Sequence, residues 1–295
     1  MHLRRRLVDR ITGSWMVISL ITILLLPIII GAGLYYKSIP ILEEHSLWQL
    51  ITSSEWSPHK GNFGFWPYIS STLYVTLIAF VLSAPFCLFA AIHLTEYASK
   101  RFVRIIHPVI DILAGLPSVI YGVWGILVIV PFISKHLGPL FGEKTTGYSI
   151  LSGGIVLGIM CIPYMLNMLI EFFRTVPKGT REASLSLGAT YWESIKHVVI
   201  RHSRPGIVSA FGLSFAKAIG ETIAVMMVVG NRILVTANPF DAGYPLPALI
   251  ANNYGEMLSI PMYDAALMFA ALLLLVIILV INLGFRYLIH KTQKL

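Results

Sequence analysis

Residues 264–286 read DAALMFAALLLLVIILVINLGFR, and no charged residue lies between the acidic first position and the basic last one. An apolar run of about 20 residues matches the length that a helix needs to cross a bilayer. Lipid offers the backbone no hydrogen-bond partners, so such a run must be helical. Further runs of this kind precede it at residues 14–35, 69–95, 106–133, 149–173 and 206–229. We therefore predict an all-α membrane protein with six transmembrane helices, in a single transmembrane domain over residues 1–295.

The composition supports the same fold class. Of the 295 residues, 56% are apolar and only 12% are charged, about half of the charged share in an ordinary soluble domain. This balance excludes a soluble enzyme and a small secreted domain stapled by disulfides. Both cysteines, Cys87 and Cys161, fall inside predicted spans, where we expect them to pack as small hydrophobic residues.

Lysine and arginine are concentrated in alternate connections between the predicted spans, so the net charge of +8 calls for no nucleic-acid partner. The enriched segments are cytoplasmic by the positive-inside rule. We therefore expect a multi-pass protein of the cytoplasmic membrane with both termini in the cytoplasm. The first run exceeds the roughly 7–15 apolar residues of a signal peptide, so we expect it to remain uncleaved. The enriched segments hold Arg4, Arg5, Arg6 and Arg10; Lys100, Arg101 and Arg104; Arg174, Lys178, Arg181, Lys196, Arg201 and Arg204; and Arg286, Lys291 and Lys294.

The connection between the fourth and fifth spans, residues 176–201, carries the signals of a helix–turn–helix. Residues 178–187 predict a short helix, and Gly188 is placed to end it in the left-handed conformation. Thr190 and Glu193 then match a capping box at the start of a second helix. Such a knob, basic outside and apolar on one face, would either lie on anionic lipid or dock a soluble partner.

The same connection resembles the EAA loop of ABC importer permeases. The likeness rests on Glu182-Ala183-Ser184 followed, after three residues, by Gly188. Ser184 replaces the second alanine of that pattern, and Arg201 stands where its far end usually has proline. The resemblance implies a type I ABC importer permease, in which this cytoplasmic coupling loop fits a groove in an ATP-binding subunit. The coupling residues that it implies are Glu182, Ala183, Ser184, Gly188, Thr190, Trp192 and Glu193.

Three more stretches resemble the phosphate-specific branch of these permeases, and the PstC-type permease subunits in particular. They are residues 72–77 (TLYVTL), 116–122 (LPSVIYG) and 217–225 (KAIGETIAV). The resemblance implies inward transport of inorganic phosphate across a bacterial inner membrane, by a subunit that is not an enzyme and holds no cofactor. Its implied partners are a second, PstA-like permease, two copies of an ATP-binding subunit, an extracytoplasmic phosphate-binding protein and the lipid bilayer.

Lys217 and Glu221 lie near the middle of the predicted fifth span, where ionisable side chains are costly unless they are paired or face water. A spacing of four places both on one face of a helix. They would either form a self-neutralising ion pair or line the substrate pathway, where Lys217 attracts an oxyanion and Glu221 holds or gates it. The PstC family usually has arginine at position 217, whereas lysine offers a point charge rather than a planar fork. Thr222 completes the predicted pathway.

Other chemistries are weakly indicated. Residues 138–145 look like a Walker A loop, but Glu143 occupies the place of its second glycine, so we expect ATP hydrolysis in a separate subunit. The sequence has no His-Glu-x-x-His metal motif and no serine nucleophile elbow. The alternatives left open are a permease for sulfate, molybdate or phosphonate, an ion-coupled secondary transporter, and an intramembrane enzyme. The sequence shows neither the inverted repeats of the second nor a typical catalytic pair for the third.

Overall fold

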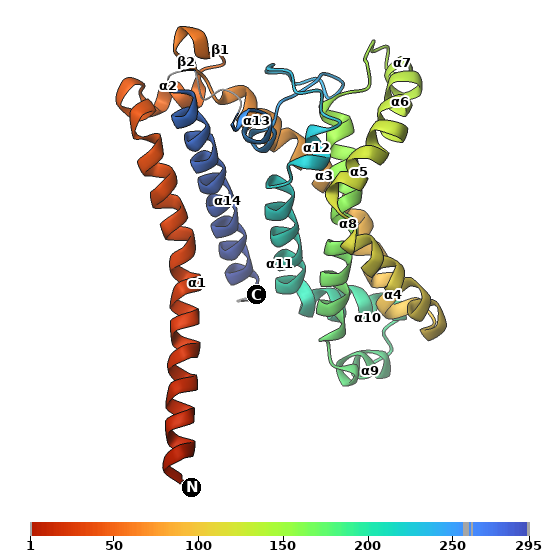
Figure 1. The fold of residues 1–295 in the computed structure, drawn as a ribbon. Coiled ribbons are helices and arrows are strands. Elements are labelled where there is room, and N and C mark those ends of the chain that lie inside the picture. Colours follow the sequence, from red (N-terminus) through yellow and green to blue (C-terminus); the bar gives the residue numbers. More distant parts are fainter. Residues whose placement is uncertain (1, 256–259, 261, 294–295) are drawn as a thin grey trace.

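The computed structural model describes residues 2–255, 260 and 262–293, with side chains for residues 11–255, 260 and 262–292. Most of its long helices run between the same two ends of the molecule (Figure 1). A small cap at one end contains α2 (Leu47–Thr52), the antiparallel strands β1 (Trp56–Ser57) and β2 (Asn62–Phe63), and the turn η1 (Pro58–Lys60). The ring of Trp56 stabilises this cap, because it meets four aromatic rings edge-on: Phe63, Phe65, Tyr68 and Tyr263.

Five helical segments in the described part of the chain are long and apolar enough to cross a membrane. Four of them contain the predicted runs 14–35, 69–95, 149–173 and 264–286 almost completely. They are Ile11–Glu44 within α1 (His2–Glu44); Trp66–Tyr97, made of α3 (Trp66–Ile92) and the π-helical turn η2 (His93–Tyr97); Ile150–Arg174, which is α8; and Tyr263–Thr292 within α14 (Tyr263–Gln293).

The predicted third span, residues 106–133, is misplaced. A separate helix, α4 (Lys100–Gly115), ends before Leu116. The remaining apolar segment, Ser118–Leu140, which is third in chain order, starts after Pro117. Leu116 is extended, with a ψ of 133°, because a residue that precedes proline is disfavoured in the helical region. The segment consists of α5 (Ser118–Trp124), η3 (Gly125–Ile129), α6 (Val130–Phe132), η4 (Ile133–Leu137) and α7 (Gly138–Leu140).

The predicted fifth span, residues 206–229, is not one helix. α11 (Ile200–Ile219) is separated from the short α12 (Ile223–Met226) by three residues that are not helical. Gly220 has low helix propensity, and the Glu221 carboxylate accepts a hydrogen bond from the Ala224 N–H (3.4 Å), which favours a new helix start. The described residues thus contain five apolar segments long enough to cross a membrane, instead of the six continuous spans predicted. The predicted fifth span corresponds to α11, which is interrupted before α12.

α3 and α8 pack closely at the centre of the molecule. A Cβ added at Gly154 of α8 would lie 2.5 Å from Ile78 Cγ2, and one added at Gly158 would lie 3.1 Å from the Ala79 carbonyl oxygen. Small residues let the backbones of membrane helices approach each other, so these two glycines allow α3 and α8 to form one packed unit. α11 packs on α8 and α14, and α14 in turn packs on α1.

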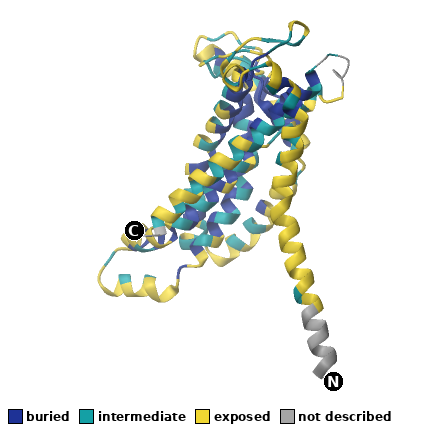
Figure 2. Ribbon diagram, turned by 90° about the vertical axis from the view of Figure 1, so that its left-hand side faces the viewer, coloured by how far each residue is buried: buried dark blue, intermediate teal, exposed yellow. Residues whose placement is uncertain are grey.

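Buried residues are concentrated in this central unit, whereas α1 is exposed along most of its length (Figure 2). Its apolar side chains point outward on all sides; Ile23, for example, is 68% exposed. A helix of this kind is stable in lipid, where an apolar surface needs no cover. The predicted orientation rests partly on Arg4, Arg5, Arg6, Arg10 and Lys294, whose side chains lie outside the described residues.

Candidate functional site

A pocket of about 200 Å³ lies where the two helix interruptions meet. Leu116 lies in the break between α4 and α5, and Ser118 is the first residue of α5. Lys217 lies in the last turn of α11, and Glu221 lies in the break between α11 and α12. Non-helical backbone at membrane depth is tolerated where it lines a cavity or is buried in protein. Both breaks therefore fit a binding site built into the membrane region. The full lining is Leu113, Ala114, Leu116, Ser118, Tyr121, Met160, Tyr164, Lys217 and Glu221.

Side chains at the two breaks satisfy backbone groups that the helices leave free. The Tyr121 hydroxyl donates a hydrogen bond to the Leu113 carbonyl (2.8 Å), and the Thr222 hydroxyl donates to the Gly220 carbonyl (3.3 Å). Such pairing is needed because an unpartnered backbone group away from water costs free energy comparable to a lost hydrogen bond. Thr222 is not among the residues that line the pocket. The structure places its hydroxyl against the Gly220 carbonyl instead.

Lys217 and Glu221 both face the pocket, but they do not share a helix face. α11 ends at Ile219, between them, so the spacing of four has no helical meaning here. Within the described residues, no carboxylate oxygen lies within 4.0 Å of Lys217 Nζ. The Lys217 ammonium instead lies 4.3 Å from the centroid of the Tyr164 ring, a favourable cation–π position. Among the described residues the structure therefore shows no direct ion pair between Lys217 and Glu221, and the choice between a neutralising role and a role in the substrate pathway stays a prediction.

The pocket thus presents a cation, a carboxylate and hydroxyl groups at one place. Lys217 can attract an anion, and the hydroxyls of Ser118 and Tyr164 can donate hydrogen bonds to it. The ionised Glu221 carboxylate only accepts hydrogen bonds, so it favours a ligand that itself carries a proton. This combination suits a small, partly protonated oxyanion.

The loop between α8 and α11 has the local geometry that the sequence predicts. α9 (Lys178–Ser186) is followed by Gly188 with a φ of +89°. Thr190 Oγ1 accepts the Glu193 N–H (3.3 Å) and the Glu193 carboxylate accepts the Thr190 N–H (2.8 Å), which is the predicted capping box. The Thr190 N–H and the Thr190 hydroxyl both donate to Glu193 Oε2 (2.8 Å each), and these two hydrogen bonds lower the pKa of Glu193 below its usual value. The second helix is α10 (Tyr191–Ser194), which continues through η5 (Ile195–Val199) into α11.

This loop exposes apolar side chains at its tip. Leu187 is 89% exposed and Trp192 is 48% exposed, whereas Ile195 and Val199, one and two turns further along, are buried. An exposed apolar patch with a polar rim is typical of a protein interaction site. The EAA-like residues Glu182 and Ala183 are exposed beside it.

Two functional candidates escaped the sequence analysis. Arg181, the residue before the EAA-like triplet, forms an ion pair with Glu96 of η2, the turn that directly follows α3, with 2.8 Å between Nη2 and Oε1. No pattern in the sequence connects these residues, because 85 positions separate them. The only available signal was an acidic residue at the end of an apolar run and a basic residue inside the EAA-like loop.

The sequence of the chain is similar to those of known membrane transport proteins. The profile of the family described as "binding-protein-dependent transport system inner membrane component" matches residues 83–294. The probable phosphate transport system permease protein PstC of Methanocaldococcus jannaschii is 33% identical over 92% of this chain and 90% of its own length. The phosphate transport system permease protein PstC of Xylella fastidiosa (strain 9a5c) is 34% identical over 76% of this chain and 73% of its own.

A solved structure shares the fold. An inward-facing chain of the MetNI methionine ABC transporter superposes with a TM-score of 0.58 at 18% identity, covering 83% of this chain and 97% of that one. At this identity the likeness concerns the fold alone.

Proposed function

The chain belongs to the family of binding-protein-dependent transport system inner membrane components, and from this premise we propose that it carries inorganic phosphate inward as one permease subunit of an ATP-driven importer. The relatives named for phosphate transport, at 33% and 34% identity over most of the chain, support this substrate. The observation that carries the proposal is the pocket that brings Lys217 and Glu221 together at two helix breaks.

The chemistry of the pocket favours phosphate over sulfate. Near neutral pH phosphate retains at least one proton, so it can donate a hydrogen bond to the Glu221 carboxylate while its other oxygens face Lys217. Sulfate has lost both protons at this pH, and its oxygens would meet the carboxylate as like charges, which is unfavourable. Molybdate resembles sulfate in this respect, whereas phosphonate resembles phosphate and is the competitor to be tested.

The importer needs partners that supply energy and substrate. Two copies of an ATP-binding subunit would dock on the coupling loop, residues 176–201, whose exposed Leu187 and Trp192 offer an apolar contact surface. A second, PstA-like permease would complete the pathway, and an extracytoplasmic phosphate-binding protein would deliver phosphate at the cap. In this arrangement the chain lies in the cytoplasmic membrane with both termini in the cytoplasm, and ATP hydrolysis takes place in its partners.

The test is phosphate uptake in proteoliposomes that hold this chain with its partner permease, ATP-binding subunit and binding protein. We expect uptake of radiolabelled phosphate that requires ATP in the compartment of the ATP-binding subunit, and that excess sulfate does not inhibit. Vesicles loaded with ADP are the control. Uptake without ATP, or ATP-driven uptake of sulfate or phosphonate in preference to phosphate, would overturn the proposal.

A further inference from the structure

Arg181 joins three elements at the cytoplasmic-loop end of the molecule. It belongs to α9, and its Nη2 donates to Glu96 Oε1 in η2, the turn that directly follows α3 (2.8 Å), and to the Phe173 carbonyl in the last turn of α8 (3.0 Å). Its Nη1 donates to the Val176 carbonyl (3.2 Å). A cation at the C-terminal end of a helix also interacts favourably with the helix dipole. One guanidinium therefore ties the coupling loop to both central helices.

Tyr191 adds a second tie from the other helix of the loop. Its hydroxyl donates a hydrogen bond to the backbone carbonyl of Glu96 (2.6 Å), and its ring packs edge-on against Tyr97 at 5.2 Å between centroids. Both helices of the loop, α9 and α10, are thus fixed to the same turn of η2. We call Arg181, Tyr191 and Glu96 the loop joint.

The ion pair of the loop joint is shielded from water, which distinguishes it from an ordinary surface pair. The side chain of Glu96 is 4% exposed and that of Arg181 is 21% exposed. The other ion pair among the described residues, Arg174 with Glu171, has a 3.6 Å separation and side chains that are 47% and 75% exposed. Exposed pairs contribute little, but removing one partner of a buried pair leaves an uncompensated charge. The loop joint is therefore expected to hold its geometry when the loop moves.

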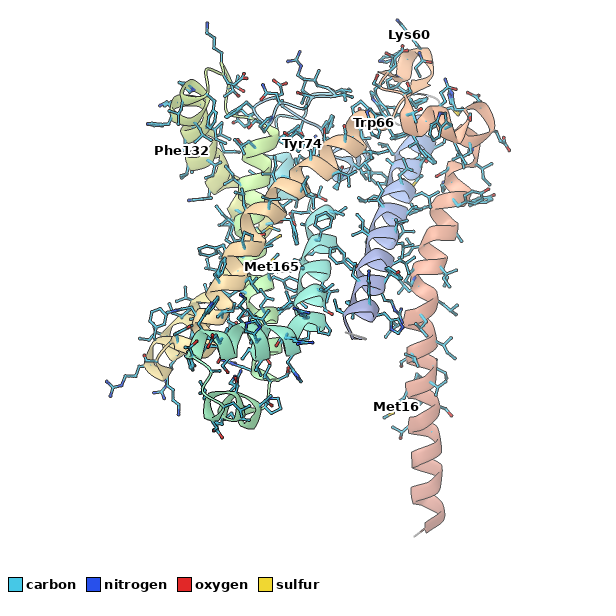
Figure 3. All side chains as sticks on the ribbon, turned by 180° about the vertical axis from the view of Figure 1, so that it is seen from behind. Met16, Lys60, Trp66, Tyr74, Phe132 and Met165 are labelled. Atoms are coloured by element: carbon cyan, nitrogen blue, oxygen red, sulfur yellow. The ribbon has the colours of Figure 1, made fainter. Side chains whose placement is uncertain are left out.

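The far end of α3 is tied to another loop. Ser71 Oγ accepts the Tyr244 N–H (3.1 Å), and Thr72 Oγ1 accepts the Leu246 N–H (2.8 Å); both contacts are buried. The Tyr74 hydroxyl donates to the Ala237 carbonyl (2.8 Å). These side chains, which we call the far anchor, hold the loop 237–246 that follows the interrupted helix (Figure 3, where Trp66 and Tyr74 mark this end of α3).

The helix between the two ties is well supported. From Ser71 to Glu96 it extends about 37 Å at 1.5 Å per residue, and it packs along α8 through the close contacts at Gly154 and Gly158. Packed helices transmit displacement because a close-packed interface has little room to deform. A shift of the coupling loop would thus move α3 and reach the loop 237–246 as well.

We propose that α3 transmits the movement of the coupling loop to the loop 237–246, and that Glu96 and Arg181 are the positioning residues through which it does so. This inference rests on the proposed function, because it assigns the route by which ATP hydrolysis in a partner opens or closes the far side of the pathway. Glu221 and the loop 237–246 lie on the same connection between α11 and α13 (Leu246–Asn253), so the route passes from the ATP-binding subunit to the pocket.

The test measures coupling rather than transport alone. In the reconstituted complex, Glu96→Gln should keep the ATP-binding subunit bound and hydrolysing ATP. The number of ATP molecules hydrolysed per phosphate imported should rise at least about tenfold, because the neutral amide holds the Arg181 guanidinium less strongly than the carboxylate does. Arg181→Lys retains the charge and should be affected less. Thr72→Val, at the far anchor, should raise the same ratio. The matched control is Glu171→Gln, which alters an exposed carboxylate and should leave the ratio unchanged.

The outcomes separate the inference from the proposed function. A wild-type complex that does not couple ATP to phosphate uptake would refute the function itself. A coupled wild type together with an equally coupled Glu96→Gln would refute the inference alone. Loss of the ATP-binding subunit from Glu96→Gln would show that the loop joint only maintains the loop, and Thr72→Val without effect would exclude α3 as the route.

Discussion

Replacing Gly188 tests whether the turn of the coupling loop must keep its shape. Its φ of +89° lies in the left-handed region, and an added Cβ would meet no atom within 4 Å apart from the adjoining backbone. The penalty of a side chain here is therefore backbone strain alone, roughly 1–2 kcal/mol for an L-residue. Valine is expected at the upper end of that range, because a β-branched residue with positive φ is a genuine outlier.

This strain should appear as weaker docking. We expect Gly188→Val to reduce the affinity of the purified ATP-binding subunit for the detergent-solubilised complex by roughly 5- to 30-fold, as 1–2 kcal/mol implies. Gly188→Asn should be milder, because asparagine tolerates the left-handed region. Gly179 in the same loop is the matched control: it has open space and no positive φ, so Gly179→Ala should preserve affinity. Equal affinities for Gly188→Val and the wild type would refute the reasoning.

Three further perturbations follow from the pocket, the helix packing and the capping box. Lys217→Met and Glu221→Gln should each lower phosphate uptake in proteoliposomes at least about tenfold, the loss expected for one charged contact, with normal membrane levels; a double variant that recovers uptake would mean that the two charges only neutralise each other. Gly154→Leu should lower the thermal unfolding midpoint of the solubilised protein, because overpacking costs about 1–3 kcal/mol; an unchanged midpoint would contradict the close contact with α3. Hydrogen bonds from Thr190 lower the pKa of Glu193, so the stabilisation is present above the pKa of a free glutamate, about 4.3, and is lost as pH falls through the lower folded value. Acid should therefore speed amide exchange of residues 188–194 after correction for intrinsic rates, and Glu193→Gln should abolish this acid effect.

The local geometry of the coupling loop could be predicted because it depends on near neighbours. Gly188 ends α9 and the Thr190–Glu193 box starts α10, and both motifs are complete within a few residues. Their hydrogen bonds join groups that are adjacent in the sequence, so no tertiary contact can easily override them. The same holds for the apolar run that became α14, whose length alone requires a helix in lipid.

The interrupted helices could not be predicted from hydropathy. An average over some 20 residues hides a break that Pro117 or Gly220 introduces at a single point, and the runs 106–133 and 206–229 were accordingly drawn through both breaks. Lys217 and Glu221, which the sequence analysis selected for their depth in the predicted span, both line a pocket, and their role in a substrate pathway stays a prediction. The prediction that they share one helix face was wrong, because the four-residue spacing has this meaning only where the helix is continuous, and α11 ends between them.

The contacts of the loop joint could not be predicted from neighbouring residues in the sequence. Arg181 and Glu96 meet because α3, α8 and α9 converge, and that convergence depends on packing between helices rather than on either residue's neighbours. Within a single sequence each looks like an ordinary charged residue at a membrane boundary.

The interruption at Gly220 also has a consequence for biogenesis. α11 is not among the segments of the described chain that are apolar enough to cross by themselves, and Lys217 in its last turn adds a charge that disfavours insertion. α11 packs against α8, which is made before it, and against α14, which is made after it. We therefore expect the stable insertion of α11 to depend on α14, which is synthesised after it. On this expectation, the charge of Lys217 is accommodated only once synthesis of the chain is nearly complete.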